Sequence, residues 1–195
     1  MKKLLILLVL FASPVAAQKL SLNEISSYLN DLKTAEGAFT QINGDGSITT
    51  GNLFIKRPGR IRFEYDPPEK SLVLAGGGQV AVFDAKSDEG ATRFPLNQTP
   101  LNIILERNVD LGRRNMVVGH VSDGTRTTVT AQDPDRPEYG FIQLVFTGNP
   151  VELRQWIVDD NSGSQTTVIL RDWKQGHRIR DRLFNIQAEM RDWGQ

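Results

Sequence analysis

Cysteine is absent from this chain of 195 residues. Its absence excludes disulfide bonds, thiolate catalysis and metal sites built on thiolates. It also excludes an acylated N-terminal cysteine, so we expect the mature chain to carry no lipid anchor. The fold must therefore be stabilised by a hydrophobic core, which a chain of this size can form without covalent cross-links.

Histidine is scarce, with only His120 and His177 in the chain. Neither has a partner at the spacing of a metal site or a catalytic pair. No G-x-S-x-G elbow occurs, and the glycine run 76–78 lies between two predicted strands rather than at the start of a phosphate-binding helix. We therefore expect no catalytic residue, no metal and no cofactor, and we predict that the protein is not an enzyme.

Acidic residues show no catalytic pattern in the sequence. Glu64 and Asp66 are two positions apart and so lie on the same side of a predicted strand, which is the ordinary arrangement of a water-facing strand surface. A pair of carboxylates is nevertheless what glycoside hydrolysis requires, and folding can create pairs that a sequence does not reveal. A secreted hydrolase with unrecognised carboxylates therefore stays open as an alternative.

Long hydrophobic runs are also scarce, and the one at the N-terminus is short. The segment MKKLLILLVLFASPVAA combines two lysines, an apolar run and a small-residue ending. The run is too short to span the bilayer core of about 30 Å, so the pattern predicts a signal peptide over residues 1–17, cleaved after Ala17. No other run reaches spanning length, and we expect residues 18–195 to form one soluble exported domain.

The chain has no excess of charge of either sign. It contains 23 basic and 23 acidic residues, and removal of Lys2 and Lys3 with the signal peptide leaves 21 and 23. The charges are mixed along the sequence and no segment forms a basic block. We therefore expect no nucleic-acid partner.

The mature chain begins with a strong helix signal in LSLNEISSYLNDL. Ser21 followed three residues later by Glu24 is a capping-box pattern, which marks a helix N-terminus. Apolar residues then recur at helical spacing. They are Leu22, Ile25, Leu29 and Leu32.

The rest of the chain is dominated by short alternating runs separated by turn residues, which predict an antiparallel meander. After an extended AFTQI, strands are predicted at 47–56, 60–66, 70–75, 79–84, 115–121, 125–132, 140–147, 151–158 and 164–173. Thr99 and Pro100 predict a helix over residues 100–107, with Thr99 as its N-cap. About ten strands are too many to lie flat, so we expect a barrel or half-barrel with a concave apolar face.

The stretch IRFEY has a clear face preference, because Ile61, Phe63 and Tyr65 alternate with Arg62 and Glu64. Period-two alternation predicts a half-buried strand. The arginines of this stretch, Arg60 included, are expected on its solvated back.

Two segments carry a family resemblance. LFIKRPGRIRFEYDPPEKSLVLAGG, followed by FPLNQTPLNIILERNVDL, resembles the K-R-P stretch and the P-L-x-x-T-P-L region of the periplasmic outer-membrane lipoprotein carrier family, the LolA type. The resemblance covers nearly all of the chain after the signal peptide. It implies a mainly β protein with helices, an unclosed antiparallel β-barrel (half-barrel) whose concave apolar face is covered by an α-helical lid.

The resemblance also implies an activity. A periplasmic chaperone of this family binds the acyl chains of lipoproteins released from the inner membrane by an ABC-type lipoprotein-releasing complex, and delivers them to an outer-membrane lipoprotein receptor. The task is physically demanding, because each buried methylene is worth about 0.8 kcal/mol and acyl chains do not cross water unaided. We expect a monomeric carrier.

The family's functional positions can be carried over onto this sequence. Arg57 matches an arginine that bonds lid backbone carbonyls, and the lid itself matches Leu101, Ile104 and Leu105. Positions that match the acyl-chain cavity are Leu53, Ile55, Ile61, Phe63, Tyr65, Leu72 and Leu74. For Leu72 and Leu74 ordinary core packing stays open, because SLVLA is apolar on both faces and its phase is ambiguous.

Two related functions are alternatives to the carrier. A receptor of similar fold would be anchored by a lipidated cysteine, which this chain does not have. A different function on the same half-barrel, as another periplasmic lipid or hydrophobic-ligand binding protein, stays open, because sequence motifs do not identify the ligand of an apolar cavity. At the C-terminus, RLFNI predicts a last strand segment, and the polar tail 186–195 is expected to be loosely held.

Overall fold

The computed structural model describes residues 18–87, 90–112, 115–161 and 163–193. The predicted signal peptide, residues 1–17, lies outside the described residues. None of the described helices is long and apolar enough to cross a membrane.

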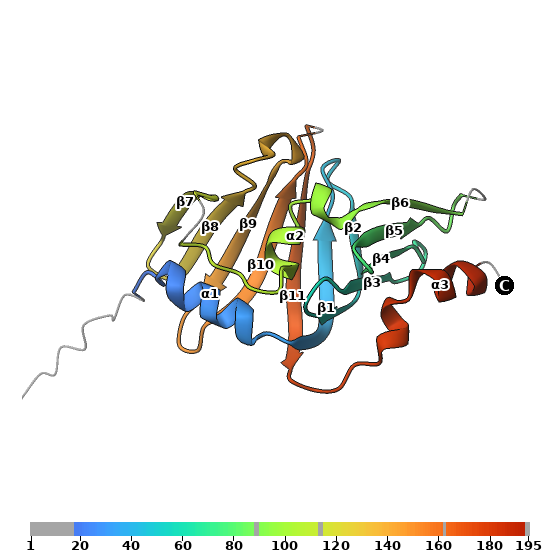
Figure 1. The fold of residues 1–195 in the computed structure, drawn as a ribbon, viewed down its shortest axis with the longest axis horizontal. Helices are drawn as coiled ribbons and strands as arrows, with labels where there is room; N and C mark the ends of the chain where they lie inside the picture. The colour runs from blue at the N-terminus through green and yellow to red at the C-terminus, as the bar shows by residue number, and fades with distance from the viewer. Residues whose placement is uncertain (1–17, 88–89, 113–114, 162, 194–195) are drawn as a thin grey trace, which may run out of the picture.

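In the described part of the chain, eleven strands form one antiparallel sheet, in the order β6-β5-β4-β3-β2-β1-β11-β10-β9-β8-β7. The strands are β1 Thr34–Ile42, β2 Ile48–Lys56, β3 Ile61–Tyr65, β4 Leu72–Gly76, β5 Gln79–Phe83, β6 Ala91–Pro95, β7 Val117–Ser122, β8 Arg126–Gln132, β9 Phe141–Thr147, β10 Glu152–Asp159 and β11 Gln165–Gln175. In the described chain no ladder joins β6 to β7, so the sheet curls without closing (Figure 1). The predicted half-barrel is confirmed, with β6 as a strand that the sequence analysis missed.

Within the described residues, six short helical elements pack on or beside the sheet. They are α1 Leu22–Asp31, η1 Leu96–Gln98, α2 Asn102–Leu105, η2 Pro137–Tyr139, η3 Asp181–Phe184 and α3 Ile186–Asp192. Figure 1 shows α1 and α2 on one face of the sheet and α3 at the other end of the molecule, beside β3–β5. We call the face that carries α1 and α2 the concave face, and the opposite one the convex face.

The first helix forms as its sequence predicts. The Ser21 hydroxyl accepts from the Glu24 N–H, and the Glu24 carboxylate accepts from the Ser21 N–H at 2.7 Å, so the capping box is complete. The helical spacing then buries Ile25 and Leu29 almost completely.

The second helix is shorter than predicted. It spans only Asn102–Leu105 instead of 100–107, and its N-cap is Leu101 rather than Thr99. The Thr99 hydroxyl donates to the Leu96 carbonyl at 2.8 Å and is therefore not aimed at the helix. At the other end Glu106 leaves helical geometry, with φ −55° and ψ 151°.

The C-terminal prediction was wrong. Instead of a strand over RLFNI, the chain forms η3 and then α3, which is capped by Asn185 accepting from the Ala188 N–H at 2.9 Å. These elements pack on the convex face in a second hydrophobic cluster, which consists of Leu72, Leu74, Ala81, Phe83, Ile179, Phe184 and Ile186. The described tail, through residue 193, is therefore docked rather than loose.

Candidate functional site

The concave face is a continuous apolar surface built by strands from both halves of the sheet. Phe39 of β1 meets Phe63 of β3 edge-on with ring centroids 5.4 Å apart, and Phe63 meets Trp156 of β10 at 6.2 Å. Tyr65 joins the same row, 5.2 Å from Phe39. These aromatic rings form the floor of the concave face.

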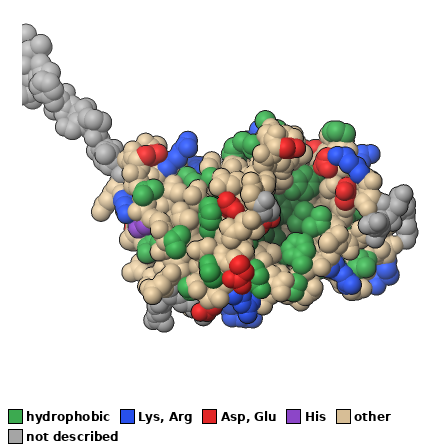
Figure 2. All heavy atoms as spheres, turned by 90° about the horizontal axis from the view of Figure 1, so that it is seen from above, with side chains coloured by type: hydrophobic (Ala, Val, Ile, Leu, Met, Phe, Trp, Pro, Cys, Tyr) green, Lys and Arg blue, Asp and Glu red, His purple; other side chains and the backbone are tan. Residues whose placement is uncertain are grey.

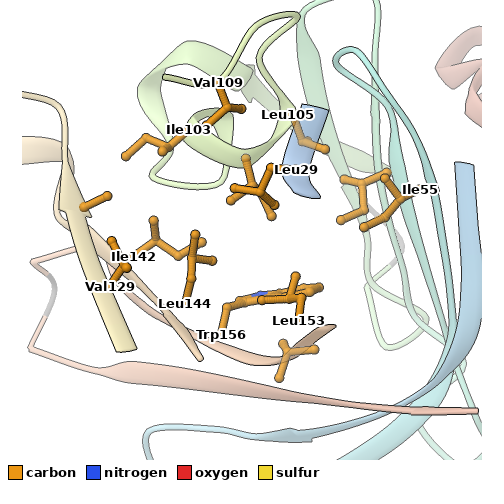
Figure 3. Packing of buried hydrophobic residues seen from close by; sticks show 14 of the residues in the cluster. Leu29, Ile55, Ile103, Leu105, Val109, Val129, Ile142, Leu144, Leu153 and Trp156 are labelled. Atoms are coloured by element: carbon orange, nitrogen blue, oxygen red, sulfur yellow. The ribbon is translucent and has the colours of Figure 1, made fainter. Parts of the chain in front are cut away.

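Side chains from α1 and α2 fill the space above this floor (Figure 3). Leu29 comes from α1, while Ile103, Ile104 and Leu105 come from α2, and each is at most 6% exposed. Figure 3 shows Leu29 and Leu105 above Trp156, between the two walls of the sheet. We call α1 and α2, with these side chains, the roof. Roof and floor belong to one hydrophobic cluster.

Arg57 joins the sheet to the roof. It lies in the turn between β2 and β3, and its guanidinium Nη2 donates to the backbone carbonyl of Glu106 at 2.5 Å. Gly59, whose φ of +70° suits glycine, places its N–H 2.8 Å from the Leu105 carbonyl. The carbonyls of Leu105, the last residue of α2, and of Glu106, the residue after it, are thus bound by one turn of the sheet. We call this pair of hydrogen bonds the latch.

The Arg57 side chain is unusually enclosed for an arginine, being only 7% exposed. Burial lowers the pKa of Arg57, partly offset by the nearby Glu106 carboxylate. Its Nε atom is buried and has no hydrogen-bond partner. A buried cation with an unused donor is held less favourably than one that is fully bonded, so the latch stabilises the closed arrangement less than a fully bonded arginine would.

One part of the concave side remains open. A groove of about 710 Å³ lies between the end of the β1–β2 hairpin and strands β3–β5. Tyr65, Val73, Val82 and Ile48 supply its apolar lining. Figure 2 shows the surface hollowed on that side of the molecule, with hydrophobic side chains lining the hollow.

Tyr65 marks the border between the groove and the buried floor. Its hydroxyl donates to Gln41 Oε1 at 2.7 Å, while its ring packs on Phe39. Burial raises the pKa of Tyr65 to about 12. The phenol therefore stays neutral across the physiological range.

The structure places most of the predicted site residues together. Leu53, Ile55, Ile61, Phe63 and Tyr65 belong to the concave cluster, as do Leu101, Ile104 and Leu105. The expectation that Leu72 and Leu74 lie in phase with them is wrong, because these two pack on the convex face. The register explains the difference: Phe63 pairs with Val73 and Ile61 with Ala75, so Val73 and Ala75 are the β4 residues that face inward.

Sequence reasoning also missed residues of the concave cluster. Val73, Ala75 and Val80 come from β4 and β5, and Leu144, Leu153 and Trp156 come from β9 and β10. In β10, Leu153 and Trp156 are both buried although they lie three positions apart, because a register shift between Leu153 and Gln155 interrupts the alternation. Period-two reasoning on ELRQWIV therefore does not find both residues.

The solvated-back prediction is wrong for Arg62. Its side chain binds Glu64 at 2.6 Å and Glu189 of α3 at 2.7 Å, and the residue is only 8% exposed because the C-terminal elements cover the back of β3. Arg60 remains partly exposed and binds the exposed carboxylate of Asp181 in η3 at 2.6 Å.

Each histidine ring contacts a neighbouring oxygen. His120 Nε2 lies 2.8 Å from the Leu20 carbonyl, and His177 Nε2 lies 3.0 Å from Glu36 Oε2. Across the described ranges, no group of three or more His, Asp or Glu side chains is arranged to hold a metal ion.

Comparison with known proteins identifies relatives. A family model described as outer membrane lipoprotein carrier protein LolA matches residues 30–187. The outer-membrane lipoprotein carrier protein of Azotobacter vinelandii is 31% identical over 195 residues, covering 95% of this chain and 93% of that protein. The protein of the same name from Xylella fastidiosa (strain Temecula1) is 26% identical over 176 residues, covering 85% of this chain and 82% of its own.

A solved structure shares the fold at low identity. A domain of an outer membrane lipoprotein-sorting protein from Vibrio parahaemolyticus superposes with a TM-score of 0.52 at 10% identity, covering 86% of this chain and 97% of that one. At this identity the likeness concerns the fold alone.

Proposed function

We infer the function from the premise that the chain belongs to the LolA family of outer membrane lipoprotein carrier proteins. It is a lipoprotein carrier. The observation that carries the more detailed proposal is the concave apolar face, which is roofed by α1 and α2 and joined to them by the latch.

We propose that the concave face binds the acyl chains of the cargo. The binding surface would consist of Leu53, Ile55, Ile61, Phe63 and Tyr65. The part of the roof that moves aside for cargo would consist of Leu101, Ile104 and Leu105. In the structure the roof side chains pack directly against this surface, in the space that acyl chains would take. Cargo binding therefore exchanges one set of apolar contacts for another, which keeps the apolar surface covered in both states.

Magnitudes favour this exchange. Exposing Ile104 and Leu105 costs about 1.5–3 kcal/mol for each side chain, and each latch hydrogen bond adds about 0.5–3 kcal/mol. An acyl chain of about sixteen carbons recovers about 0.8 kcal/mol per buried methylene, which exceeds that cost for one fully buried chain. By these magnitudes the closed state and the cargo-bound open state differ by about 1–9 kcal/mol in favour of cargo binding, which is far less than the gain from burying the chain alone.

A reduced difference between these states suits a carrier. We propose that Arg57 sets it, by stabilising the closed state so that cargo is held firmly enough to cross water and released to an acceptor that binds it more tightly. Transfer without a nucleotide requires such a downhill order of affinities. The described residues hold no metal-binding cluster, and no catalytic step is needed.

The proposed route follows from the family. Residues 1–17 would direct export to the periplasm and be cleaved after Ala17, leaving one domain over residues 18–195. The carrier, as a monomer, would take lipoproteins from an inner-membrane ABC-type releasing complex and hand them to an outer-membrane receptor.

The direct test of carriage uses spheroplasts that are making lipoproteins. Purified chain added to the medium is expected to bring newly made lipoprotein into the soluble fraction as a one-to-one complex. Failure to release lipoprotein, with a different lipid copurifying, would instead support a general binder of hydrophobic ligands.

A further inference from the structure

The roof contains one long connection that crosses the open side of the sheet. It joins β6 to β7, the two edge strands, and its described residues are 96–112 and 115–116. Figure 1 shows it passing across the concave face beside α1. We call residues 96–112 the strap.

The far end of the strap is held by α1 through side chains that bind backbone. Asn30 donates from Nδ2 to the Val109 carbonyl at 2.8 Å and accepts the Val109 N–H on Oδ1 at 2.9 Å. Ser26, one turn earlier, accepts the Leu111 N–H at 3.1 Å. Val109 and Leu111 are each 2% exposed, so these bonds lie at the border of the core, where water competes poorly.

The helix that offers these groups is itself fixed to the sheet. Before α1, the Leu20 N–H donates to the Thr127 hydroxyl of β8 at 3.0 Å, and His120 of β7 contacts the Leu20 carbonyl. Within α1, the Tyr28 hydroxyl accepts from Gln175 at the end of β11 at 3.0 Å. Leu29 is buried in the concave cluster.

The near end of the strap is held by the other half of the sheet, at the turn between β4 and β5. The Leu96 N–H donates to the Gly78 carbonyl, in the turn between β4 and β5, at 2.9 Å. Residues 97–108, which include α2, therefore lie between two fixed points. Between those points the latch, from Arg57 and Gly59, supplies the hydrogen bonds to the sheet.

We propose that Asn30 is a positioning residue that anchors the hinge of the strap at Val109. Release of the latch frees residues 97–108 to swing with α2, while Asn30 keeps Val109 and the following residues on α1. The inference rests on the proposed function for its purpose, because a hinge matters only if the roof opens for cargo.

Asparagine suits this place for a chemical reason. Its amide presents one donor and one acceptor in a plane, so it pairs with both groups of a single peptide residue as a neighbouring strand would. Two hydrogen bonds to the same residue fix its orientation as well as its position. The α1 side of the roof would then stay closed, and opening would be directed toward β3–β5, where the groove already lies.

The test is amide hydrogen exchange of the empty chain, read residue by residue. In Arg57→Leu we expect faster exchange at Gly59 and in α2, with Val109 and Leu111 still protected. In Asn30→Ala we expect Val109 to exchange about tenfold faster, which is the effect of losing its side-chain acceptor. Combining both changes should extend fast exchange from α2 through Leu111.

The control is Asn23→Ala, the same substitution at an exposed site of the same helix. It should leave exchange at Val109 unchanged, and thermal unfolding of all variants should show that each is folded. The proposal is overturned if Arg57→Leu exposes Val109 and Leu111 as much as α2, or if Asn30→Ala leaves Val109 protected. Because no cargo is present, these outcomes are separate from the spheroplast test of carriage.

Discussion

The ring of Phe63 on β3 contacts that of Trp156 on β10 edge-on, with centroids 6.2 Å apart, although three strands separate β3 from β10 in the sheet. In a flat sheet four strand spacings of about 4.8 Å would place them roughly 19 Å apart. The contact therefore measures how strongly the sheet curls. It also makes Phe63 a residue of both the core and the proposed cargo surface.

Removing this contact should weaken the empty fold. Phe63→Ala is expected to lower the free energy of unfolding by about 3–5 kcal/mol, because the cavity left between the two halves of the sheet cannot collapse fully. Urea unfolding measures the change. Val118→Ala is the control, since Val118 is 61% exposed, and its effect should stay within about 0.5 kcal/mol. Equal effects of the two substitutions would mean that Phe63 is not a core residue.

Removing the latch should strengthen cargo binding and impair delivery. Arg57→Leu loses a hydrogen bond from a charged donor, which stabilises the closed state by about 1.5–3 kcal/mol. Cargo affinity should rise about tenfold or more, so transfer to a receptor is no longer downhill. We expect the variant to accept lipoprotein from spheroplasts but to retain it when mixed with outer membranes. Normal transfer by Arg57→Leu would remove the latch from the mechanism.

Alkaline pH should destabilise the protein through Tyr65. Its pKa is raised by burial to about 12, above the unfolded value near 10. The stabilising contribution is therefore complete below about pH 10 and is lost as pH rises toward 12, by at most about 3 kcal/mol. The pKa of Tyr28 is also raised by burial, so the difference between wild type and Tyr65→Phe isolates Tyr65. A difference in unfolding free energy that does not change between pH 9 and 12 would contradict the assignment.

The docking of α3 should depend on one buried ion pair. Glu189 binds Arg62, whose side chain is 10% exposed, whereas Asp192 of the same helix binds Arg182, which is 77% exposed. Glu189→Gln is expected to cost about 1–3 kcal/mol of unfolding free energy, since it weakens the pairing of a buried guanidinium. Asp192→Asn should change it by less than about 1 kcal/mol. Urea unfolding of the two variants compares them, and an equal loss would contradict the buried role of Arg62.

Sequence patterns predicted those elements whose two faces differ. The capping box at Ser21 gave the start of α1 correctly, and the alternation of Ile61 and Phe63 with Arg62 gave the inward face of β3. In both places one side of the element is clearly polar.

Where both faces of an element are covered, the sequence pattern does not show which face points inward. Strand β4 meets the concave cluster through Val73 and Ala75 and the convex cluster through Leu72 and Leu74, so its sequence is apolar throughout. The helix that covers its convex side could not be predicted, because α3 offers only a few apolar residues and gains its stability from the sheet rather than from propensity. Because the sequence did not predict that α3 covers this face, Arg62 was expected to be solvated.

The central claim is that acyl chains lie on the concave face, and site-specific photocrosslinking tests it most directly. A photoreactive phenylalanine analogue replaces either Tyr65, on the concave side, or Phe54, a half-buried aromatic residue that packs with the convex cluster. Each variant is loaded with lipoprotein carrying radiolabelled acyl chains and then irradiated. We predict a labelled adduct at position 65 and none at position 54. Labelling at position 54 alone, or equally at both positions, would contradict the account.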